Sequence, residues 1–381
     1  MNSIAILILG GCSYSFLNSD ARDTNQVFYY PPVTAEEGNW ERTSPENEGW
    51  DPQALERVFE YARAHNSSGL VIIKNGRILA ERKWELKNPL VWYGAYYEDI
   101  WFHGRTPDGW AREDVASTQK SIISILAGIA CDKKLLDLDA PVSTYLGPGW
   151  SKATPGQEAA IKVRHLLAMS SGITEKLEYE FPAGEDWKYI NKAYSLVNEV
   201  IQVATGKLPN EFTREWLTGP LGMAQTEWIV RSEFFRQWNM NGLVTTARDL
   251  ARFGLMIQAG GTWNGRQIVS QAYLEQALSP SQPHNPAYGL LWWLNNPEGF
   301  EWGRSKKGVE TGKFVPDAPG DMIAAMGTSE RRVYVVPSLG LVVTRTGSSA
   351  KLDDKGQIVN HGYFDRGLWR LLRDTMPSTR K

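Results

Sequence analysis

The hydrophobic pattern near the start of the chain predicts one amphipathic helix followed by a β-hairpin. Apolar residues recur at helical spacing over residues 51–65, which places them on one helix face. Two strand-like runs follow at residues 69–74 and 77–84, and the dipeptide Asn75-Gly76 between them is typical of a two-residue hairpin turn. Residues 13–48 are polar and show no periodicity, so we expect an extended arm before the helix.

The pattern then becomes helical and later returns to strands. Four segments with helix signals follow, at residues 163–169, 194–204, 246–259 and 270–278. Strand-like runs and a last amphipathic helix complete the chain, at residues 288–294, 331–336, 341–346 and 363–375. Strands from both chain ends around a helical block predict an α/β (α+β) protein. We expect an antiparallel sheet flanked by the terminal helices, with a mostly helical domain inserted in it.

This pattern also gives a domain organisation. Residues 1–48 are expected to form a leader and the extended arm. Residues 49–112 and 286–376 are expected to form one discontinuous sheet domain, and residues 113–285 the helical domain.

The helical block begins with a segment that can carry a nucleophile. Ser117 and Lys120 are three residues apart, so on a helix they share a face, and the following residues 121–130 are almost all apolar or small. Low-dielectric surroundings favour the neutral amine of a lysine, and a neutral amine can activate a serine. The N–H groups at a helix start also suit an oxyanion. The alternative is an ordinary helix that Ser117 caps.

Two other Ser-x-x-Lys matches lack this context. Ser348 and Lys351 follow a strand-like run in a Gly/Ser turn, and Ser378 and Lys381 lie at the C-terminal end. Neither match opens an apolar helix, so neither is expected to supply a nucleophile.

Composition narrows the possible functions. The net charge is −2, the pI is near 6.3 and no run of lysine and arginine stands out, which argues against nucleic acid as the main partner. Two cysteines and five scattered histidines give neither a disulfide framework nor a local metal motif, so we expect no metal and no cofactor. Aromatic residues crowd residues 89–112, either to pack that loop or to form, through Trp101, one wall of a substrate pocket.

The N-terminus leaves two localisations open. The residues Leu9-Gly10-Gly11-Cys12 resemble the lipobox of bacterial lipoproteins, in which the cysteine carries the lipid. We therefore expect a lipid anchor at Cys12, with the protein in the bacterial periplasm or anchored to the membrane. The alternative is a disordered cytoplasmic leader, because Met1-Asn2-Ser3 has no positively charged side chain.

A second polar motif, Tyr189-x-Asn191, completes a recognisable set. Four further stretches match the same family and fall in the expected order after Ser117-x-x-Lys120, at residues 164–172, 204–206, 220–223 and 242–250. Over roughly residues 50–375 the chain resembles the serine β-lactamase and penicillin-binding-protein superfamily, in its class C β-lactamase and family VIII-type serine esterase branch. The resemblance implies a β-lactamase/transpeptidase-like fold.

The resemblance also implies a two-step acyl transfer. Ser117 attacks a carbonyl carbon, and Lys120 and Tyr189 together take its proton and pass it to the leaving group. Because tyrosine has a reference pKa near 10, it needs nearby positive charge to act as a base. Asn191 is expected to hydrogen-bond either Lys120 or the substrate. For Tyr189 the alternative is a core tyrosine with a satisfied hydroxyl.

The third motif of the superfamily, Lys-Thr-Gly, is missing. Residues 325–332 stand in its place. Gly327 permits close backbone approach, and an N–H group near Thr328 or Ser329 would complete an oxyanion hole with that of Ser117. Side chains expected to line the substrate pocket, apart from Trp101, are Trp187, Arg331 and Arg332. The two arginines would replace the missing positive charge, unless they are solvated strand residues.

The expected partner is a small-molecule ester or amide substrate, and the sequence does not indicate the oligomeric state. Three hypotheses about function follow. The first is a serine hydrolase of the esterase or amidase type, because the lost lysine would otherwise bind the carboxylate of a β-lactam. The second is a β-lactamase, D-amino-acid peptidase or penicillin-binding enzyme. The third is a non-catalytic cell-envelope binding protein that kept the fold.

Overall fold

The computed structural model describes residues 27–34, 36–91, 95–233, 241–302, 308–352 and 362–377. Cys12, the Trp92-Tyr93 part of the aromatic segment and the Ser378-x-x-Lys381 match lie outside these residues.

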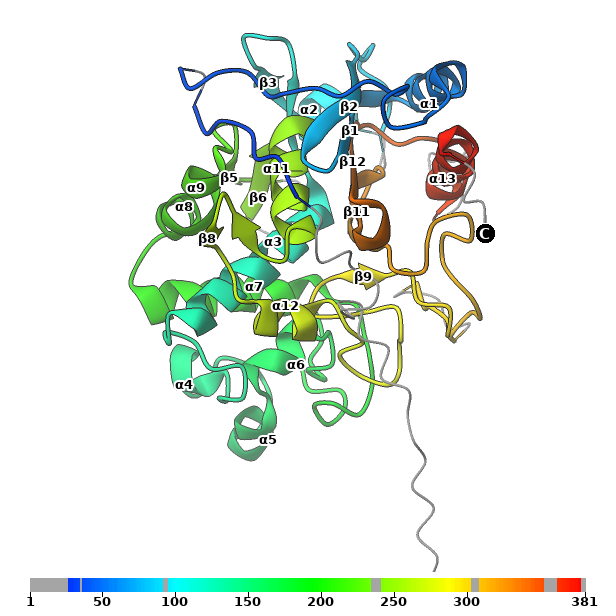
Figure 1. The fold of residues 1–381 in the computed structure, drawn as a ribbon. Coiled ribbons are helices and arrows are strands. Elements are labelled where there is room, and N and C mark those ends of the chain that lie inside the picture. The colour runs from blue at the N-terminus through cyan, green and yellow to red at the C-terminus, as the bar shows by residue number, and fades with distance from the viewer. Residues whose placement is uncertain are drawn as a thin grey trace, which may run out of the picture.

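Strands from both chain ends form one antiparallel sheet, as the sequence predicts. Its order is β2-β1-β12-β11-β10-β9. The strands are β1 (Ser67–Lys74), β2 (Arg77–Lys83), β9 (Trp293–Leu294), β10 (Ile323–Gly327), β11 (Arg331–Val336) and β12 (Leu341–Gly347). Figure 1 shows the blue N-terminal strands beside the orange C-terminal ones. The predicted hairpin is confirmed, and Asn75 and Gly76 both have positive φ, as a tight turn of this kind requires.

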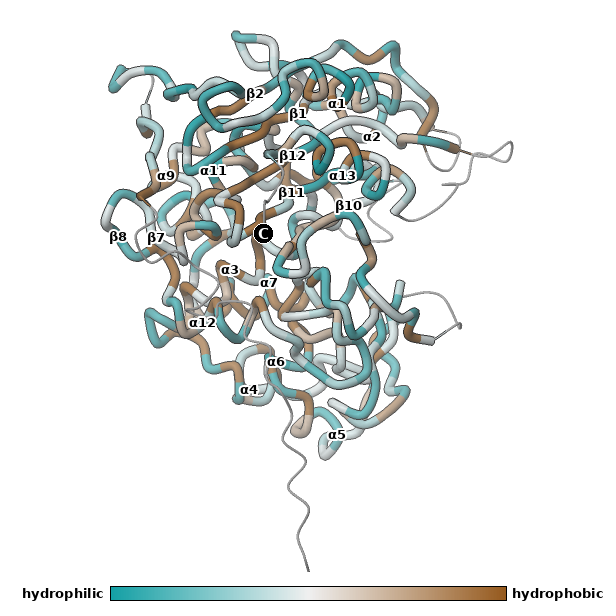
Figure 2. Tube along the Cα trace, turned by 45° about the vertical axis from the view of Figure 1, so that its right-hand side comes forward, coloured by the Kyte–Doolittle hydropathy of each residue, from teal (hydrophilic) through white to brown (hydrophobic). Residues whose placement is uncertain are grey.

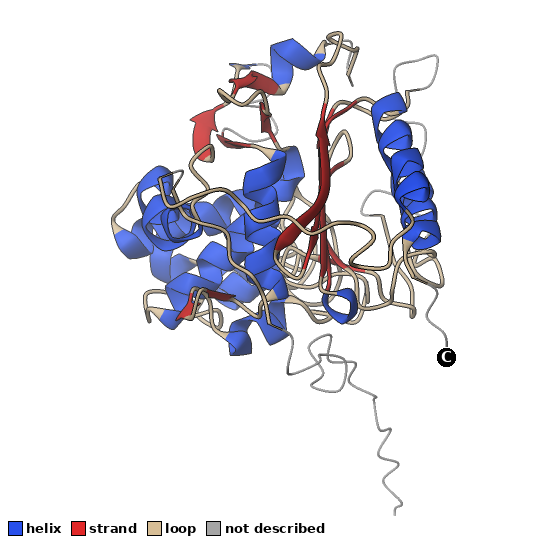
Figure 3. Ribbon diagram, turned by 45° about the horizontal axis from the view of Figure 1, so that its top comes forward, coloured by secondary structure: helices blue, strands red, loops and turns tan. Residues whose placement is uncertain are grey.

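Helices cover both faces of the sheet, which explains why its central strands are buried on both sides. Terminal helices α1 (Pro52–Ala64) and α13 (Tyr363–Thr375) pack together through the stacked rings of Tyr61 and Phe364. Helix α11 (Ala247–Gln258) lies on the opposite face, where Gly254 leaves room for Val342. Figure 3 shows the strands between these two helical layers, and Figure 2 shows how hydrophobic the central strands are.

The inserted segment is largely helical. It contains η2 (Ala116–Thr118), α3 (Gln119–Asp132), α4 (Ser143–Leu146), α5 (Pro155–Ala160), α6 (Val163–Leu167), α7 (Asn191–Thr205), α8 (Pro209–Thr213), η3 (Arg214–Thr218), α9 (Gly219–Leu221), α11 and α12 (Gln271–Ala277). The four helices predicted there are present. Helix α7 begins three residues earlier than predicted, at Asn191.

The inserted segment and the residues just before it also contain strands that the hydrophobic pattern did not predict. A second antiparallel sheet has the order β3-β4-β6-β5, with β3 (Phe102–Arg105), β4 (Ala111–Asp114), β5 (Glu227–Val230) and β6 (Asn241–Thr245). It follows the short helix α2 (Tyr97–Ile100), so part of the expected aromatic loop is regular structure. A third pair, β7 (Thr262–Trp263) and β8 (Arg266–Gln267), forms a small hairpin, and η4 (Pro337–Leu339) joins β11 to β12. Conversely, residues 288–294 form a strand only at β9.

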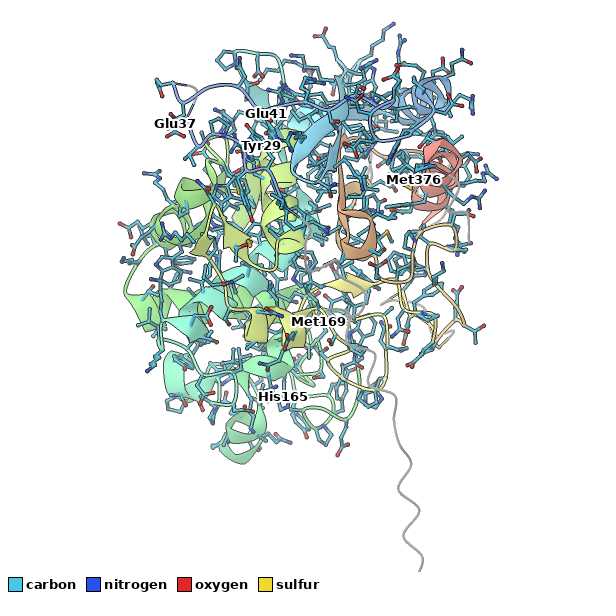
Figure 4. The ribbon with its side chains drawn as sticks, viewed as in Figure 1. Tyr29, Glu37, Glu41, His165, Met169 and Met376 are labelled. Carbon is cyan, nitrogen blue, oxygen red and sulfur yellow. The ribbon has the colours of Figure 1, made fainter. Side chains whose placement is uncertain are left out.

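The described part of the predicted arm runs along the surface. Figure 4 labels Tyr29 and Glu41 beside the blue N-terminal strands, and Glu37 farther out at the upper left of the molecule. Trp40 Nε1 donates a hydrogen bond to the carbonyl of Gly76 at 2.8 Å. Within the described ranges, no helix has the length and apolar character needed to span a membrane.

Candidate active site

Ser117 stands out in the buried segment that precedes and forms α3. Every residue from 113 to 130 is buried except Ser117, which is partly exposed. Ala116, directly before it, has a φ of 50°, a conformation that costs energy for a residue with a Cβ. The Ala116 N–H is held by Asp114 Oδ1 at 2.8 Å. The local backbone therefore presents the Ser117 side chain at the surface of an otherwise closed core.

Lys120 lies against Ser117, as the three-residue spacing predicts. Its Nζ is 2.7 Å from Ser117 Oγ and 3.1 Å from Asn191 Oδ1. Lys120 is only 2% exposed, and its Nζ lies 4.8 Å from the ring centroid of Tyr189 and 4.1 Å from that of Tyr194. The faces of aromatic rings attract a cation, so both rings contribute favourably to the site when the amine is charged.

Asn191 reaches Lys120 because a carboxylate holds the start of α7. Glu175 accepts hydrogen bonds from the Asn191 N–H at 2.7 Å and from Asn191 Nδ2 at 3.2 Å. It also accepts the Lys192 N–H at 2.8 Å, which satisfies free donors at the helix N-terminus. Because Glu175 binds the NH₂ group of the amide, the oxygen of Asn191 faces Lys120. The structure thus shows the first of the two contacts predicted for Asn191.

Tyr189 lies in a cluster of aromatic rings. It stacks on Trp293 with centroids 6.2 Å apart and meets Tyr288 edge-on at 6.2 Å. Trp187 is 6.4 Å from the ring of Tyr189 and is buried behind it. Tyr189 itself is partly exposed. The cluster fixes the ring of Tyr189 beside Lys120 and leaves part of it accessible.

A buried polar network fixes the backbone on either side of Ser117. Asp114 forms a bidentate ion pair with Arg231 at 2.6 and 2.8 Å. Burial opposes ionisation of Asp114, but Arg231 and the Ala116 N–H outweigh it and lower the pKa of this carboxyl. Gln119 accepts the Leu243 N–H at 2.8 Å and so ties the start of α3 to β6. The backbone around Ser117 is therefore fixed from two sides.

The strand that replaces the Lys-Thr-Gly region ends against the nucleophile turn. A Cβ added to Gly327 would lie 2.4 Å from Val115 O and 3.0 Å from Thr118 N, so only glycine fits there. Thr118 Oγ1 donates to the Arg331 carbonyl at 3.1 Å. Gly327 thus lies against the turn that carries Ser117. Ser329 is buried, and its hydroxyl pairs with that of Ser349.

The residues predicted to line a pocket lie deeper than expected. Arg331 is fully buried, 3.4 Å from Glu113, with its guanidinium 4.4 Å from the ring centroid of Trp101. Arg332 is 5% exposed and pairs with Asp365 at 2.7 and 3.1 Å. Neither arginine is a solvated strand residue, and both charges have carboxylate partners in the core.

Some of the supporting residues left no clear signal in the sequence. Asp114 and Gln119 flank Ser117, and polar residues inside an apolar run do indicate a buried network. Glu175 and Arg231 lie in irregular segments outside the motifs, and no local pattern marks them. Among the residues that the structure describes, no group of three or more His, Cys, Asp or Glu could hold a metal ion.

Fold and site together define a member of the serine β-lactamase and penicillin-binding-protein superfamily. The family model "Beta-lactamase" matches residues 55–348, and the chain belongs to this family. An uncharacterized protein of Alkalihalophilus pseudofirmus is 24% identical over 314 residues, which are 74% of this chain and 84% of that protein.

Solved structures show the same fold. A candidate β-lactamase from Bacteroides dorei aligns with a TM-score of 0.63 at 18% identity, over 86% of this chain and 99% of that one. A D-stereospecific amidohydrolase from Streptomyces aligns with a TM-score of 0.54 at 16% identity, over 80% of this chain and 97% of that one. The chain is thus similar to hydrolases of the β-lactamase fold.

Proposed function

We propose that this protein is a serine hydrolase that cleaves a small ester or amide through an acyl-enzyme. The observation that carries the proposal is the 2.7 Å contact between Lys120 Nζ and Ser117 Oγ, made by a buried amine and the one partly exposed residue of its segment. A serine with a base in hydrogen-bond reach, itself oriented by a third group, is the arrangement that nucleophilic catalysis needs. Asn191 is that third group.

The reaction has two steps. Ser117 Oγ bonds to the carbonyl carbon of the substrate while its proton passes to Lys120 and Tyr189, which deliver it to the departing alcohol or amine as that bond breaks. Water then attacks the acyl-enzyme, gives up a proton to the same pair, and releases the acid as Ser117 regains its proton. Both steps pass through an oxyanion, for which the N–H groups of Ser117 and Thr328 are the donors in this proposal.

The absence of a lysine at the end of β10 favours substrates without a carboxylate beside the scissile bond. Ala325 and Met326 precede Gly327 where the superfamily has Lys-Thr. Arg331 and Arg332 do not replace that charge, because each is buried with an acidic partner. An esterase or amidase of neutral substrates therefore fits the site better than an efficient β-lactamase.

The test is intact-protein mass spectrometry after incubation with a fluorophosphonate probe. The wild type is expected to gain one adduct, which Ser117→Ala abolishes and Tyr189→Phe slows at least 10-fold. Ser348→Ala is the matched control, because Ser348 is the other described serine of a Ser-x-x-Lys match and is fully buried. It should label like the wild type.

An unlabelled wild type would overturn the proposal and favour the binding-protein alternative. A second candidate, β-lactamase activity, draws support from the family match at residues 55–348. Rapid nitrocefin turnover that depends on Ser117, without turnover of neutral esters, would place this second candidate first.

A further inference from the structure

Three buried arginines hold three consecutive carbonyl groups at the turn between β10 and β11. Arg332 Nη1 donates to the Gly327 carbonyl at 2.6 Å, and Arg331 Nη1 donates to the Thr328 carbonyl at 3.0 Å. Arg345 Nη1 donates to the Ser329 carbonyl. We call these three contacts the carbonyl clamp. It acts on the strand end that lies against the nucleophile turn.

Burying the three guanidinium groups of the carbonyl clamp costs free energy, so we expect the arrangement to serve a purpose beyond satisfying three carbonyls. Three guanidinium groups are withdrawn from water within one turn, and burying charge is costly even when partners are present. Burial lowers the pKa of Arg345 to about 10, and the charge of Arg331 acts in the same direction. Neutral side chains could satisfy three carbonyls at lower cost.

A hydrogen bond that fixes the direction of a peptide carbonyl also fixes the direction of the N–H group in the same peptide. In a trans peptide the carbonyl of one residue and the N–H of the next point in opposite directions. Arg332 contacts the Gly327 carbonyl from the side of α13, where it pairs with Asp365. The Cβ side of Gly327 faces Val115 and Thr118 instead. The N–H of Thr328 is therefore turned away from α13.

From this geometry we infer that Arg332, held by Asp365, is a positioning residue that aims the N–H of Thr328 at the oxyanion. The inference rests on the proposed function, because it assigns a role within the same acyl transfer. Arg332 does not touch the substrate. It acts through the Gly327–Thr328 peptide, and a fixed donor stabilises charge in the transition state without reorganising.

The C-terminal helix takes part in this arrangement. Asp365 belongs to the first turn of α13 and is fully buried. Its carboxylate accepts hydrogen bonds from Nε and Nη2 of Arg332 and from the hydroxyl of Tyr334 on β11. A substitution that removes the Asp365 carboxylate should therefore free Arg332, and with it the Gly327–Thr328 peptide that Arg332 holds.

The experiment compares steady-state hydrolysis of an activated neutral ester and of its thionoester by four proteins: wild type, Arg332→Lys, Asp365→Asn and Arg248→Met. A lysine keeps the charge but cannot bond Asp365 and the Gly327 carbonyl together as a planar fork does. Arg248 is the matched control, since it pairs with Glu81 at 2.7 Å and contacts none of the clamped carbonyls.

For Arg332→Lys and Asp365→Asn we expect kcat to fall about 10- to 100-fold with KM within about 3-fold, because outright loss of an oxyanion donor costs about 10²–10³. The ratio of ester to thionoester rates should also fall at least about 5-fold, since sulfur accepts N–H hydrogen bonds weakly. A merely structural role would lower stability and leave that ratio unchanged. Arg248→Met should keep both kcat and the ratio.

Two outcomes would overturn the inference. One is a soluble variant with unchanged kcat and unchanged ester preference. The other is a loss of kcat that matches the unfolded fraction, measured by circular dichroism at the assay temperature. If Arg332→Lys does not fold, Asp365→Asn decides by the same criteria, and if neither folds the role is structural and the inference fails. An inactive wild type would refute the proposed function instead.

Discussion

At the scale of single residues, the orientation of one amide decides whether Lys120 meets an acceptor or a donor. Glu175 holds the NH₂ group of Asn191, so the amide oxygen faces Lys120 Nζ. Without Glu175 the amide could turn and present its NH₂ group to the amine. We therefore expect Glu175→Ala to slow labelling of Ser117 by a fluorophosphonate about 3- to 10-fold. Stopped labelling reactions followed by mass spectrometry give the rate.

Glu178→Ala is the control for this prediction. Glu178 is an exposed neighbour that pairs with Lys152 at 3.3 Å, and its removal should leave the labelling rate unchanged. Equal rates for Glu175→Ala and Glu178→Ala would show that the amide of Asn191 keeps its orientation without help.

Which residues the sequence could reveal follows from how local their chemistry is. Ser117 and Lys120 are three residues apart on one helix, so their 2.7 Å contact was predictable from spacing. Glu175, in contrast, reaches Asn191 across 16 residues of irregular chain. The burial of Arg331 and Arg332 could not be predicted either, because an arginine in a strand-like run is usually solvated unless carboxylates from distant parts of the chain pair with it.

At the scale of elements, long periodic segments were predictable and short strands were not. Helices α1 and α13 and the β1–β2 hairpin follow strong local patterns, and the structure confirms all three. Strands β3 and β4 have four residues each and are rich in charged or aromatic residues, so they carry no alternation. They form because β6, more than 100 residues later, pairs with β4, and such tertiary pairing overrides local preference.

The nucleophile helix makes one close contact that tests its packing. A Cβ added to Gly128 of α3 would lie 2.4 Å from the ring of Tyr273, which donates a hydrogen bond to the Ser124 carbonyl at 2.6 Å. Overpacking a closed core typically costs about 1–3 kcal/mol. We expect Gly128→Ala to lower the free energy of unfolding by about that amount in urea denaturation.

Gly156 offers a matched comparison. It lies in α5, and a Cβ there would meet no atom within 4 Å. Gly156→Ala should leave the protein as stable as the wild type or up to about 1 kcal/mol more stable, because alanine favours helix. If both substitutions had the same effect, α3 and α12 would be able to separate without cost.

At the scale of the whole molecule, the arm bridges the sheet and the helical part. Trp40 donates to Gly76 in the β1–β2 turn, and its ring lies 5.0 Å from the guanidinium of Arg252 on α11. Arg252 in turn donates to the carbonyl of Pro32 at 2.8 Å. We expect Trp40→Ala to cost about 2 kcal/mol of unfolding free energy, from lost ring burial, one hydrogen bond and the cation–π contact.

Thermal and urea unfolding of Trp40→Ala beside Val27→Ala would check this. Val27 is 84% exposed, so its truncation should be neutral. A Trp40→Ala protein as stable as the Val27→Ala control would mean that the arm rests on the surface without stabilising the fold.

The stability of the whole protein should also depend on pH through one buried acid. Burial raises the pKa of Asp249 to about 6, although the Thr226 hydroxyl and the Gln225 N–H each donate to it at 2.8 Å. Arg252 and Arg112 oppose the rise but do not cancel it. In the unfolded chain the value returns to 3.8, so between these two pH values the folded state binds more protons than the unfolded state.

The contribution of Asp249 to stability is therefore fully present below about pH 3.8 and is lost as the pH rises through about 6. The difference between the two pKa values corresponds to about 3 kcal/mol. Asp249→Asn removes the titration, so the stability of the variant relative to the wild type should increase by up to that amount between pH 4 and pH 7. Urea denaturation of both proteins at each pH measures the difference, in which all other titrating groups cancel. A constant difference across this range would mean that Asp249 stays ionised in the fold, and that its two donors and Arg252 outweigh its burial.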